Sequence, residues 1–290
     1  MSKEEFTLQV VLDVGCGTGI LSMFAAKAGA KHVYAVDCSS IINQASQIVE
    51  RNGFKDQITL IQGKIEEIEL PVSKVDIIIS EWMGYFLLYE SMLDTVIFAR
   101  DKWLIDNGII FPDKAVMYIC AMEDAQVKQE RIDFWDNVYG FDMSPIKDIA
   151  YLEPVVDIVD SKSIVSTSTA ILNIDILNCT KEELSFQANF QLQAQRNDYV
   201  HGFVAYFECA FTQIHKPIGF STSPYSKYTH WKQTIFYLKD VITICDGETI
   251  HGTISCKPNN KNPRDLDIKL NVNFTGRHSR LESNMDYKLR

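Results

Sequence analysis

Two glutamates frame an aromatic loop in the first third of the sequence. Residues 80–90 read Ser-Glu-Trp-Met-Gly-Tyr-Phe-Leu-Leu-Tyr-Glu, so Glu81 and Glu90 enclose a stretch without other charges. Two carboxylates in apolar surroundings repel each other and raise one pKa unless a cation lies between them. A guanidinium suits that position, because its planar fork donates paired hydrogen bonds to carboxylates and is always charged. General acid and base catalysis on a neutral substrate is an alternative use of the pair, but it leaves the aromatic walls unexplained.

A glycine-rich turn is the second candidate site. Residues 11–19 read Val-Leu-Asp-Val-Gly-Cys-Gly-Thr-Gly, which places alternate glycines between an expected strand and an expected helix. Backbone without side chains lets a ligand lie against the strand end and the helix N-terminus. Asp37 ends the next expected strand about 20 residues later, where a carboxylate can accept hydrogen bonds from ribose hydroxyls. The pattern predicts a nucleoside cofactor, although a dinucleotide site has similar glycine spacing and Asp37 could also be a solvated strand end.

Two further acidic side chains lie where a parallel sheet would bind a ligand. Asp13 is within the first expected strand, and Glu66 follows the third. Ligands bind at the carboxyl ends of such strands, and Glu66 could accept a hydrogen bond from an adenine amine. Because Glu66 also belongs to the acidic run at residues 66–69, a solvated surface role is the alternative.

The elements that would position these sites follow from hydrophobic periodicity. Strands are expected at residues 10–14, 33–37, 58–62 and 75–80, and helices at residues 20–27 and 41–52. This alternation predicts a parallel sheet covered by helices. After Phe111-Pro112, alternating apolar and polar residues predict antiparallel strands of a sandwich or barrel at residues 170–177, 184–192, 203–212, 233–238 and 266–274. We therefore expect two units, residues 1–112 and 113–290, with residues 275–290 as a short polar tail.

A charged, aromatic and helix-compatible insertion lies between the alternating strand and helix pattern of the first part and the antiparallel strand pattern of the second. It spans residues 123–145 and carries Phe134, Trp135, Tyr139 and Phe141 before Pro145. Aromatic side chains on a projecting element usually mark an interface. Burial against the parent domain is the alternative.

The amino-acid composition limits the classes of protein to which the chain can belong. Hydrophobic residues make up 46% of the 290, as in ordinary folded proteins, and no apolar run approaches the roughly 18 to 20 residues of a membrane span. The seven cysteines show no C-x-x-C spacing and residues 1–9 lack an apolar signal segment, so we expect reduced thiols, an intracellular location and no metal site. The 38 acidic and 28 basic residues disfavour nucleic acid and favour cationic partners, unless the net charge of -10 serves only solubility.

These motifs together resemble the protein arginine N-methyltransferase family. The resemblance is carried by VLDVGCGTG, by SEWMGYFLLYE and by Tyr228-Thr229-His230-Trp231, and it covers nearly the whole chain. It implies an α/β Rossmann-like S-adenosylmethionine-dependent methyltransferase domain, followed by an antiparallel β-barrel with a helical dimerisation arm at residues 123–145. It is most similar to the type I enzymes, which make monomethyl and asymmetric dimethylarginine.

The resemblance also assigns roles residue by residue. Glu81, Glu90 and His230 would be catalytic, and Tyr85 and Trp231 would bind substrate. Met92 matches a methionine that helps restrict dimethylation to one nitrogen. The cofactor would contact Asp13, Gly15, Gly17, Thr18, Asp37, Cys38, Ile65, Glu66, Glu81 and Met92. The implied partners are Arg/Gly-rich segments of proteins, including histones and RNA-binding proteins, and a second copy of the chain, in the nucleus and cytoplasm.

The sequence begins about ten residues before the glycine turn. Family members carry preceding helices that close over the cofactor, with a Tyr-Phe motif, an Arg and a carboxylate partner for the histidine, so we expect those helices to be lacking here. A lid excludes water and completes the site. Two alternatives therefore stay open: a catalytically impaired form that dimerises with a full-length arginine methyltransferase, and a small-molecule methyltransferase.

Overall fold

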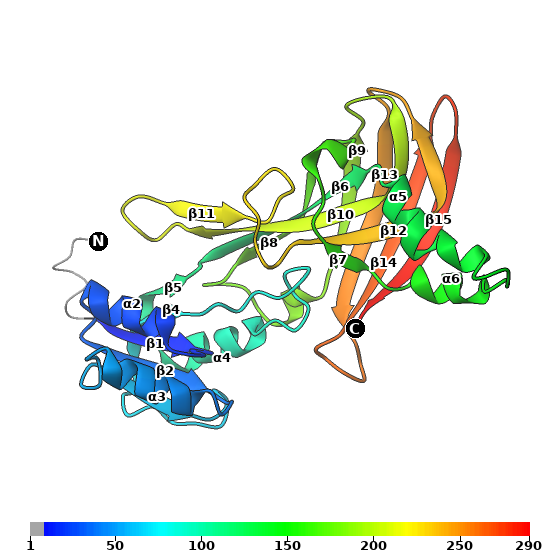
Figure 1. Ribbon diagram of the computed structural model, residues 1–290. Coiled ribbons are helices and arrows are strands. Elements are labelled where there is room, and N and C mark those ends of the chain that lie inside the picture. Colours follow the sequence, from blue (N-terminus) through cyan, green and yellow to red (C-terminus); the bar gives the residue numbers. More distant parts are fainter. Residues whose placement is uncertain (1–8) are drawn as a thin grey trace.

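A parallel sheet forms the N-terminal half of the protein, whose computed structural model describes residues 9–290 (Figure 1). Its strands are β1 (Val10–Val14), β2 (His32–Asp37), β3 (Ile58–Gln62), β4 (Val75–Ile79) and β5 (Leu104–Phe111). The order is β3-β2-β1-β4-β5, so the direction of strand succession reverses between β1 and β4. Open sheets of this kind bind ligands at the carboxyl ends of the strands flanking that reversal.

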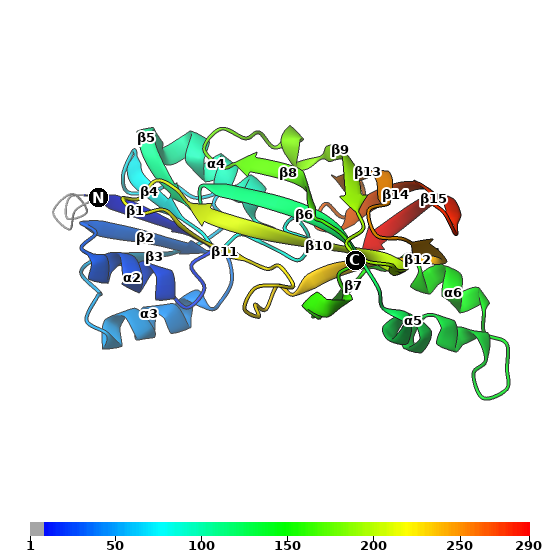
Figure 2. The ribbon, with the colours of Figure 1, turned by 90° about the horizontal axis from the view of Figure 1, so that it is seen from above.

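Helices cover both faces of this sheet (Figure 2). Helices α2 (Ile20–Ala28) and α3 (Ile42–Arg51) lie on one face, and α4 (Leu93–Trp103) lies on the other. Val11 and Ile77 pack in the core on the α2 and α3 side, whereas Leu12 and Ile78 belong to the core that includes α4. Strands buried on both faces must be apolar throughout, which explains their nearly continuous hydrophobic sequence.

The predicted elements of this half are confirmed with small shifts at their ends. Strands β1 and β3 have the predicted bounds, and β2, β4, α2 and α3 differ from prediction by one residue at one or both ends. Strand β5 and helix α4 were not predicted. In β5 the polar residues Asp106, Asn107 and Gly108 interrupt the apolar run, which hides the strand from periodicity arguments.

Two antiparallel sheets form the second half and pack against each other as a barrel (Figure 1). The strands are β6 (Lys114–Met122), β7 (Val155–Asp157), β8 (Thr169–Asp175), β9 (Phe186–Gln193), β10 (Asp198–Phe211), β11 (Ile218–Ser221), β12 (Gln233–Ile244), β13 (Thr249–Pro258), β14 (Leu266–Thr275) and β15 (Arg280–Leu289). One sheet has the order β7-β12-β10-β6-β8 with β11 beside β10, and the other has β15-β14-β13-β9. The Tyr287 hydroxyl of β15 donates to the Tyr237 carbonyl of β12 at 2.8 Å, which joins the two sheets.

The expectation of a polar tail at residues 275–290 is wrong. Residues 280–289 form β15, which pairs with β14 from Leu266↔Leu289 to Thr275↔Arg280. Met285, Tyr287 and Leu289 are buried while the residues between them are exposed. The strand is half-buried, and its charged outer face concealed the inward alternation.

The insertion projects from the barrel, away from the parallel sheet (Figures 1 and 2). It contains α5 (Ala125–Arg131), a 3-10 turn η1 (Asp133–Asp136) and α6 (Pro145–Ala150), and we call residues 123–150 the arm. Its internal ion pairs join Lys147 to Asp133 at 2.9 Å and to Asp136 at 2.8 Å. The arm is thus a folded element rather than a loose loop.

The described residues agree with the expectation of mostly buried, reduced cysteines. All seven are free thiols; Cys38 is exposed, Cys245 is partly buried and the rest are buried. Within residues 9–290, no helix has both the length and the apolar character needed to cross a bilayer.

Candidate active site

The glycine turn lies between the end of β1 and the start of α2. Gly15 and Gly17 have φ of +74° and +54°, a left-handed region that residues with a Cβ rarely adopt. The amides of Gly15 and Cys16 donate to the Val36 carbonyl at 2.9 and 3.0 Å, and the Gly17 amide donates to Asp37 Oδ2 at 2.9 Å. The turn is therefore fastened to the end of β2 before any ligand binds.

Asp13 is a buried carboxylate beneath this turn. The Ser22 hydroxyl donates to its Oδ2 at 2.6 Å, while Oδ1 is buried and has no hydrogen-bond partner among residues 9–290. Burial raises the pKa of Asp13 to about 6. A buried acceptor without a partner is costly, so a donor from a bound ligand would satisfy it.

Met92 covers the glycine turn from the other side. A Cβ on Gly15 would lie 2.6 Å from Met92 Cε, and the Met92 amide donates to the Trp82 carbonyl at 2.9 Å. Met92 is thus in contact with the turn that would hold a cofactor and tied to the loop that begins at Glu81. This contact joins the two candidate sites.

The other predicted cofactor residues lie around the same strand ends. The Thr95 hydroxyl of α4 donates to Glu66 Oε1 at 2.9 Å, and Glu66 is exposed. Ile65 is buried, and Thr18 and Cys38 are exposed. The Ser80 hydroxyl at the end of β4 donates to the Val14 carbonyl at 2.8 Å. This bond links the carboxyl end of β4 to the carboxyl end of β1.

We expect Gly15→Ala to weaken cofactor binding strongly. The new Cβ would lie 2.6 Å from the flexible tip of Met92, which would have to move, and would sit on a backbone with φ of +74°. We expect at least a tenfold higher Kd for S-adenosylhomocysteine, with a left-handed penalty of about 1–2 kcal/mol. Calorimetric titration measures this. Gly53→Ala is the matched control, because it has φ of +78° and nothing within 4 Å of the new Cβ. Equal affinity of the Gly15 variant and the unsubstituted chain would contradict the placement of the site.

The loop between β4 and α4 has an unusual backbone. Phe86, Leu87 and Glu90 have φ of 50°, 58° and 53°, although none is glycine. Each non-glycine residue in this conformation carries a strain energy of about 1–3 kcal/mol, so it persists only where packing holds it. The buried side chains of Phe86, Leu87 and Leu88 provide this anchorage. The anchored loop presents Glu81 at one end and Glu90 at the other.

Glu81 lines an apolar pocket of about 370 Å³. The other lining residues come from α2, β4, the cis peptide segment Phe111-Pro112 and the barrel: Leu21, Phe24, Ala25, Ala28, Ile79, Ser80, Met83, Phe111, Pro112, Phe211, Phe220 and Trp231. Although Glu81 keeps contact with solvent, its surroundings desolvate the carboxylate and raise its pKa. An apolar pocket with one carboxylate is suited to a cation that carries an apolar stem.

Trp231 holds this pocket together across the two halves of the protein. Its indole Nε1 donates to the Met83 carbonyl at 3.0 Å, and its ring stacks on Phe220 with a centroid distance of 5.3 Å. The barrel thereby fixes the position of the loop from the parallel sheet.

The remaining predicted substrate residues lie outside the lining of this pocket. His230 is exposed and packs its ring against Trp231 at a centroid distance of 4.0 Å. Tyr85 is also exposed and forms a backbone bridge with Tyr89. Glu90 faces Arg264 of the barrel, with Nη2 to Oε1 at 3.3 Å. The structure therefore brings Glu81 and Trp231 into one cavity but does not place Glu90 or His230 in it.

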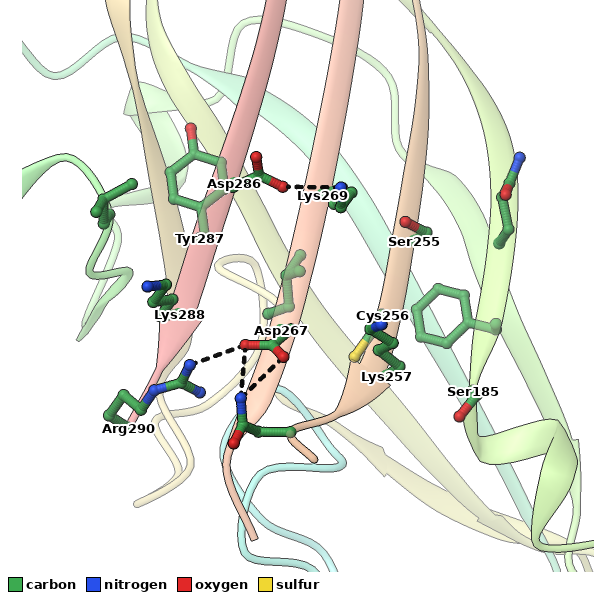
Figure 3. Close-up of a pocket in the computed structure, with 15 residues that line it drawn as sticks. Ser185, Ser255, Cys256, Lys257, Asp267, Lys269, Asp286, Tyr287, Lys288 and Arg290 are labelled. Carbon is green, nitrogen blue, oxygen red and sulfur yellow. Dashed lines mark hydrogen bonds and ion pairs between the residues drawn. The ribbon is translucent and has the colours of Figure 1, made fainter. Parts of the chain in front are cut away.

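A larger hollow of about 810 Å³ lies on the outer face of the barrel sheet (Figure 3). Several of its charged residues pair with each other, with Lys269 to Asp286 at 3.4 Å and Arg290 to Asp267 at 2.8 Å. It is remote from the carboxyl ends of the parallel strands, so we place the active site at the glycine turn and Glu81.

Comparison with known families agrees with this architecture. Residues 11–99 match a methyltransferase domain, and residues 113–277 match the arginine methyltransferase oligomerization subdomain. A catalytic α/β domain for methyl transfer is thus followed by a barrel that mediates oligomerisation. The fold and the site define an S-adenosylmethionine-dependent methyltransferase.

The relatives are more specific. The chain is 57% identical to protein arginine N-methyltransferase 1.1 of Arabidopsis thaliana over 97% of this chain and 72% of that protein. It is 56% identical to protein arginine N-methyltransferase 1 of Chlamydomonas reinhardtii over 98% of this chain and 83% of that protein. The solved Trypanosoma brucei PRMT1 enzyme-prozyme heterotetrameric complex with AdoHcy contains a chain of 49% identity and TM-score 0.97, with 99% and 91% of the two chains covered. The chain belongs to the protein arginine N-methyltransferase family.

The site residues fit the cofactor of this family. The unpartnered Oδ1 of Asp13 can accept a hydrogen bond, the glycine turn offers backbone without side chains, and Asp37 lies at the end of β2. S-adenosylmethionine supplies an electrophilic methyl group on a sulfonium. The contact between Met92 and the turn places a soft thioether and the start of α4 beside this site.

Proposed function

We propose that the chain methylates arginine guanidinium groups in Arg/Gly-rich protein segments, giving monomethyl and asymmetric dimethylarginine. The observation that carries the proposal is Glu81 in an otherwise apolar, aromatic pocket of about 370 Å³. A guanidinium with its apolar stem matches both the charge and the walls of this pocket. Histones and RNA-binding proteins contain such segments, and the excess of acidic residues, 38 against 28, favours cationic partners.

The residues of the chain would act by alignment and charge placement. Glu81 and, at the other end of the loop, Glu90 would bind the nitrogens that do not react and draw positive charge toward themselves. The reacting nitrogen keeps more lone-pair density, which assists attack on the methyl carbon. The raised pKa of Glu81 suits it to take up the proton that the methylated guanidinium releases.

Product analysis tests the regiochemistry. The purified chain, S-adenosylmethionine and an Arg/Gly-rich peptide should yield monomethyl and asymmetric dimethylarginine after hydrolysis and chromatography. Symmetric dimethylarginine would contradict the proposed role of Met92 at the site. A folded dimer that binds S-adenosylhomocysteine but gives no methylated arginine would instead support a role as dimerisation partner.

We further propose that the arm mediates a head-to-tail homodimer. Tyr139, Phe141 and Ile149 on the arm are 97%, 73% and 58% exposed, an unusual density for a surface in water. At the opposite end of the molecule, Ile20 on α2 is 48% exposed, while Phe24 further along the helix lines the Glu81 pocket. An arm that packs on α2 of a second copy, and the reverse contact, would cover both patches in one closed ring.

Replacing Tyr139 and Phe141 together with serine is expected to convert the dimer to a monomer. Two exposed aromatic side chains would be lost from the proposed interface, whereas the ion pairs of Lys147 that hold the arm would remain. Light scattering during size-exclusion chromatography measures the mass. Tyr225→Ser, a substitution of an exposed tyrosine outside the arm, is the control. A dimer that survives the double substitution would exclude the arm as its interface.

A further inference from the structure

The β13–β14 turn of the barrel contacts the second glutamate of the loop. The Glu90 amide donates to the Arg264 carbonyl at 3.1 Å, and Arg264 Nε and Nη2 each lie 3.3 Å from Glu90 Oε1. Both side-chain contacts use the same oxygen. Among residues 9–290, Glu90 Oε2 makes no hydrogen bond, so this oxygen stays available to a second guanidinium.

Hydrogen bonds within the turn order the segment that carries Arg264. Asn259 Oδ1 accepts hydrogen bonds from the amides of Lys261 and Asn262, and Asn262 Oδ1 accepts one from the amide of Arg264. The base of the turn is fixed by β15, where Arg290 Nη2 donates to Asp267 Oδ1 at 2.8 Å, as the dashed lines of Figure 3 show. Asn259 Nδ2 also donates to both oxygens of Asp267, at 3.2 and 2.9 Å. A fixed turn can hold a side chain of another domain in one orientation.

Glu90 needs such support. It ends the loop in a left-handed conformation, with φ of 53°, and its side chain is half exposed. Its side chain lies outside the hydrophobic core that holds Phe86 and Leu87. An ionic contact at one oxygen is therefore the feature that sets where the other oxygen points.

From this arrangement we propose that Arg264 is a positioning residue, which orients Glu90 for the substrate guanidinium and links the barrel to the catalytic loop. The inference rests on the proposed function. Arg264 would hold Oε1 while Oε2 binds substrate, so the barrel contributes to catalysis without touching the reacting atoms. The contact spans 174 residues of sequence, and the turn and the loop come together only in the folded protein.

The ion pair between Arg264 and Glu90 contributes little to the stability of the fold. Its removal should therefore change catalysis without unfolding the protein. The side chains of Arg264 and Glu90 are 63% and 50% exposed, and ion pairs this exposed add little to the free energy of unfolding. The variants Arg264→Ala and Arg264→Lys should therefore fold like the unsubstituted chain. Lys261→Ala is the matched control, because Lys261 is exposed in the same turn and its side chain makes no ion pair among the described residues.

Steady-state methylation of an Arg/Gly-rich peptide at saturating S-adenosylmethionine separates the possible roles. Arg264→Ala should lower kcat roughly 10- to 100-fold, since small misplacements of a binding group have effects of that size. KM for the peptide should stay the same or fall, because the site loses a competing positive charge. Arg264→Lys should restore part of kcat, because it keeps a positive charge beside Glu90 Oε1.

Each contrary outcome has a separate meaning. Unchanged kcat in Arg264→Ala would overturn the inference. A higher kcat would also overturn it, because Arg264 would then be an inhibitory occupant of the substrate site. Absence of turnover by the unsubstituted chain would instead count against the proposed function. Hydrogen exchange of residues 84–92 should be equal in Arg264→Ala and the unsubstituted chain, because buried side chains and the bond from the Glu90 amide to the residue 264 carbonyl hold the loop backbone. Lost protection in the variant would assign a fall in kcat to the loop backbone and overturn the positioning role.

Discussion

Glu81→Gln is expected to lower kcat for arginine methylation by about 10²- to 10³-fold, the usual range for loss of one electrostatic contact in an active site. Glutamine keeps the shape of the side chain but removes the negative charge from a pocket whose other lining is almost entirely apolar. A cationic guanidinium then has no anion inside the pocket. Affinity for S-adenosylhomocysteine should change little, because the glycine turn and Asp37, where we expect most of the contacts to that ligand, are unaltered.

The pH dependence gives a second readout for the same residue. Burial raises the pKa of Glu81 above the ordinary value of glutamate, so the carboxylate ionises only at correspondingly higher pH. Activity that needs ionised Glu81 should fall as the pH drops through this raised pKa. Glu67→Gln is the control, since Glu67 is an exposed partner of Lys64. Near-normal kcat in Glu81→Gln would remove the residue from its proposed role.

Gly84→Ala is expected to abolish turnover through the loop itself. A Cβ at this position would lie 1.6 Å from the Tyr89 carbonyl oxygen and 2.8 Å from its carbon, and backbone atoms cannot yield as a flexible side chain does. The loop must open between Glu81 and Glu90, which also disturbs the buried Phe86 and Leu87. Overpacking of this kind costs about 1–3 kcal/mol or more, and Tm should fall by roughly 5 °C or more.

Gly53→Ala separates this steric effect from the general cost of replacing glycine. Gly53 has a positive φ of +78° but nothing within 4 Å of a new Cβ. Its variant should lose about 1–2 kcal/mol of stability and keep full activity. Calorimetric unfolding and peptide methylation measure both quantities. A fully active Gly84→Ala variant would show that the loop conformation is not required for catalysis.

Much of the N-terminal half could be predicted because its elements have sharp local signals. Strand β1 is an apolar run that meets Gly15, and β3 is a run that ends at Gln62 before Gly63. Prediction failed for β5 and β15. The interruption at Asn107 concealed β5, and the charged outer face of β15 made a half-buried strand resemble a polar tail.

The candidate site was predictable only in part for a related reason. The glycine turn and the loop of Glu81 are each contiguous in sequence, and their place at strand ends follows from the fold. The hydrogen bond from Trp231 to the Met83 carbonyl joins residues 148 positions apart. Arg264, in a turn rich in asparagine and proline, has no local feature that marks it as a neighbour of Glu90. Such contacts depend on how the barrel packs on the parallel sheet, which residue spacing does not encode.

Selectivity for arginine over lysine tests the central claim most directly. The purified chain would be incubated with methyl-labelled S-adenosylmethionine and either an Arg/Gly-rich peptide or its twin with every arginine replaced by lysine. The Glu81 pocket, with Glu90 at the other end of its loop, is proposed to bind a planar guanidinium, which predicts label in the arginine peptide and none above background in the lysine peptide. Equal labelling of the two peptides, or labelling of the lysine peptide alone, would contradict the account.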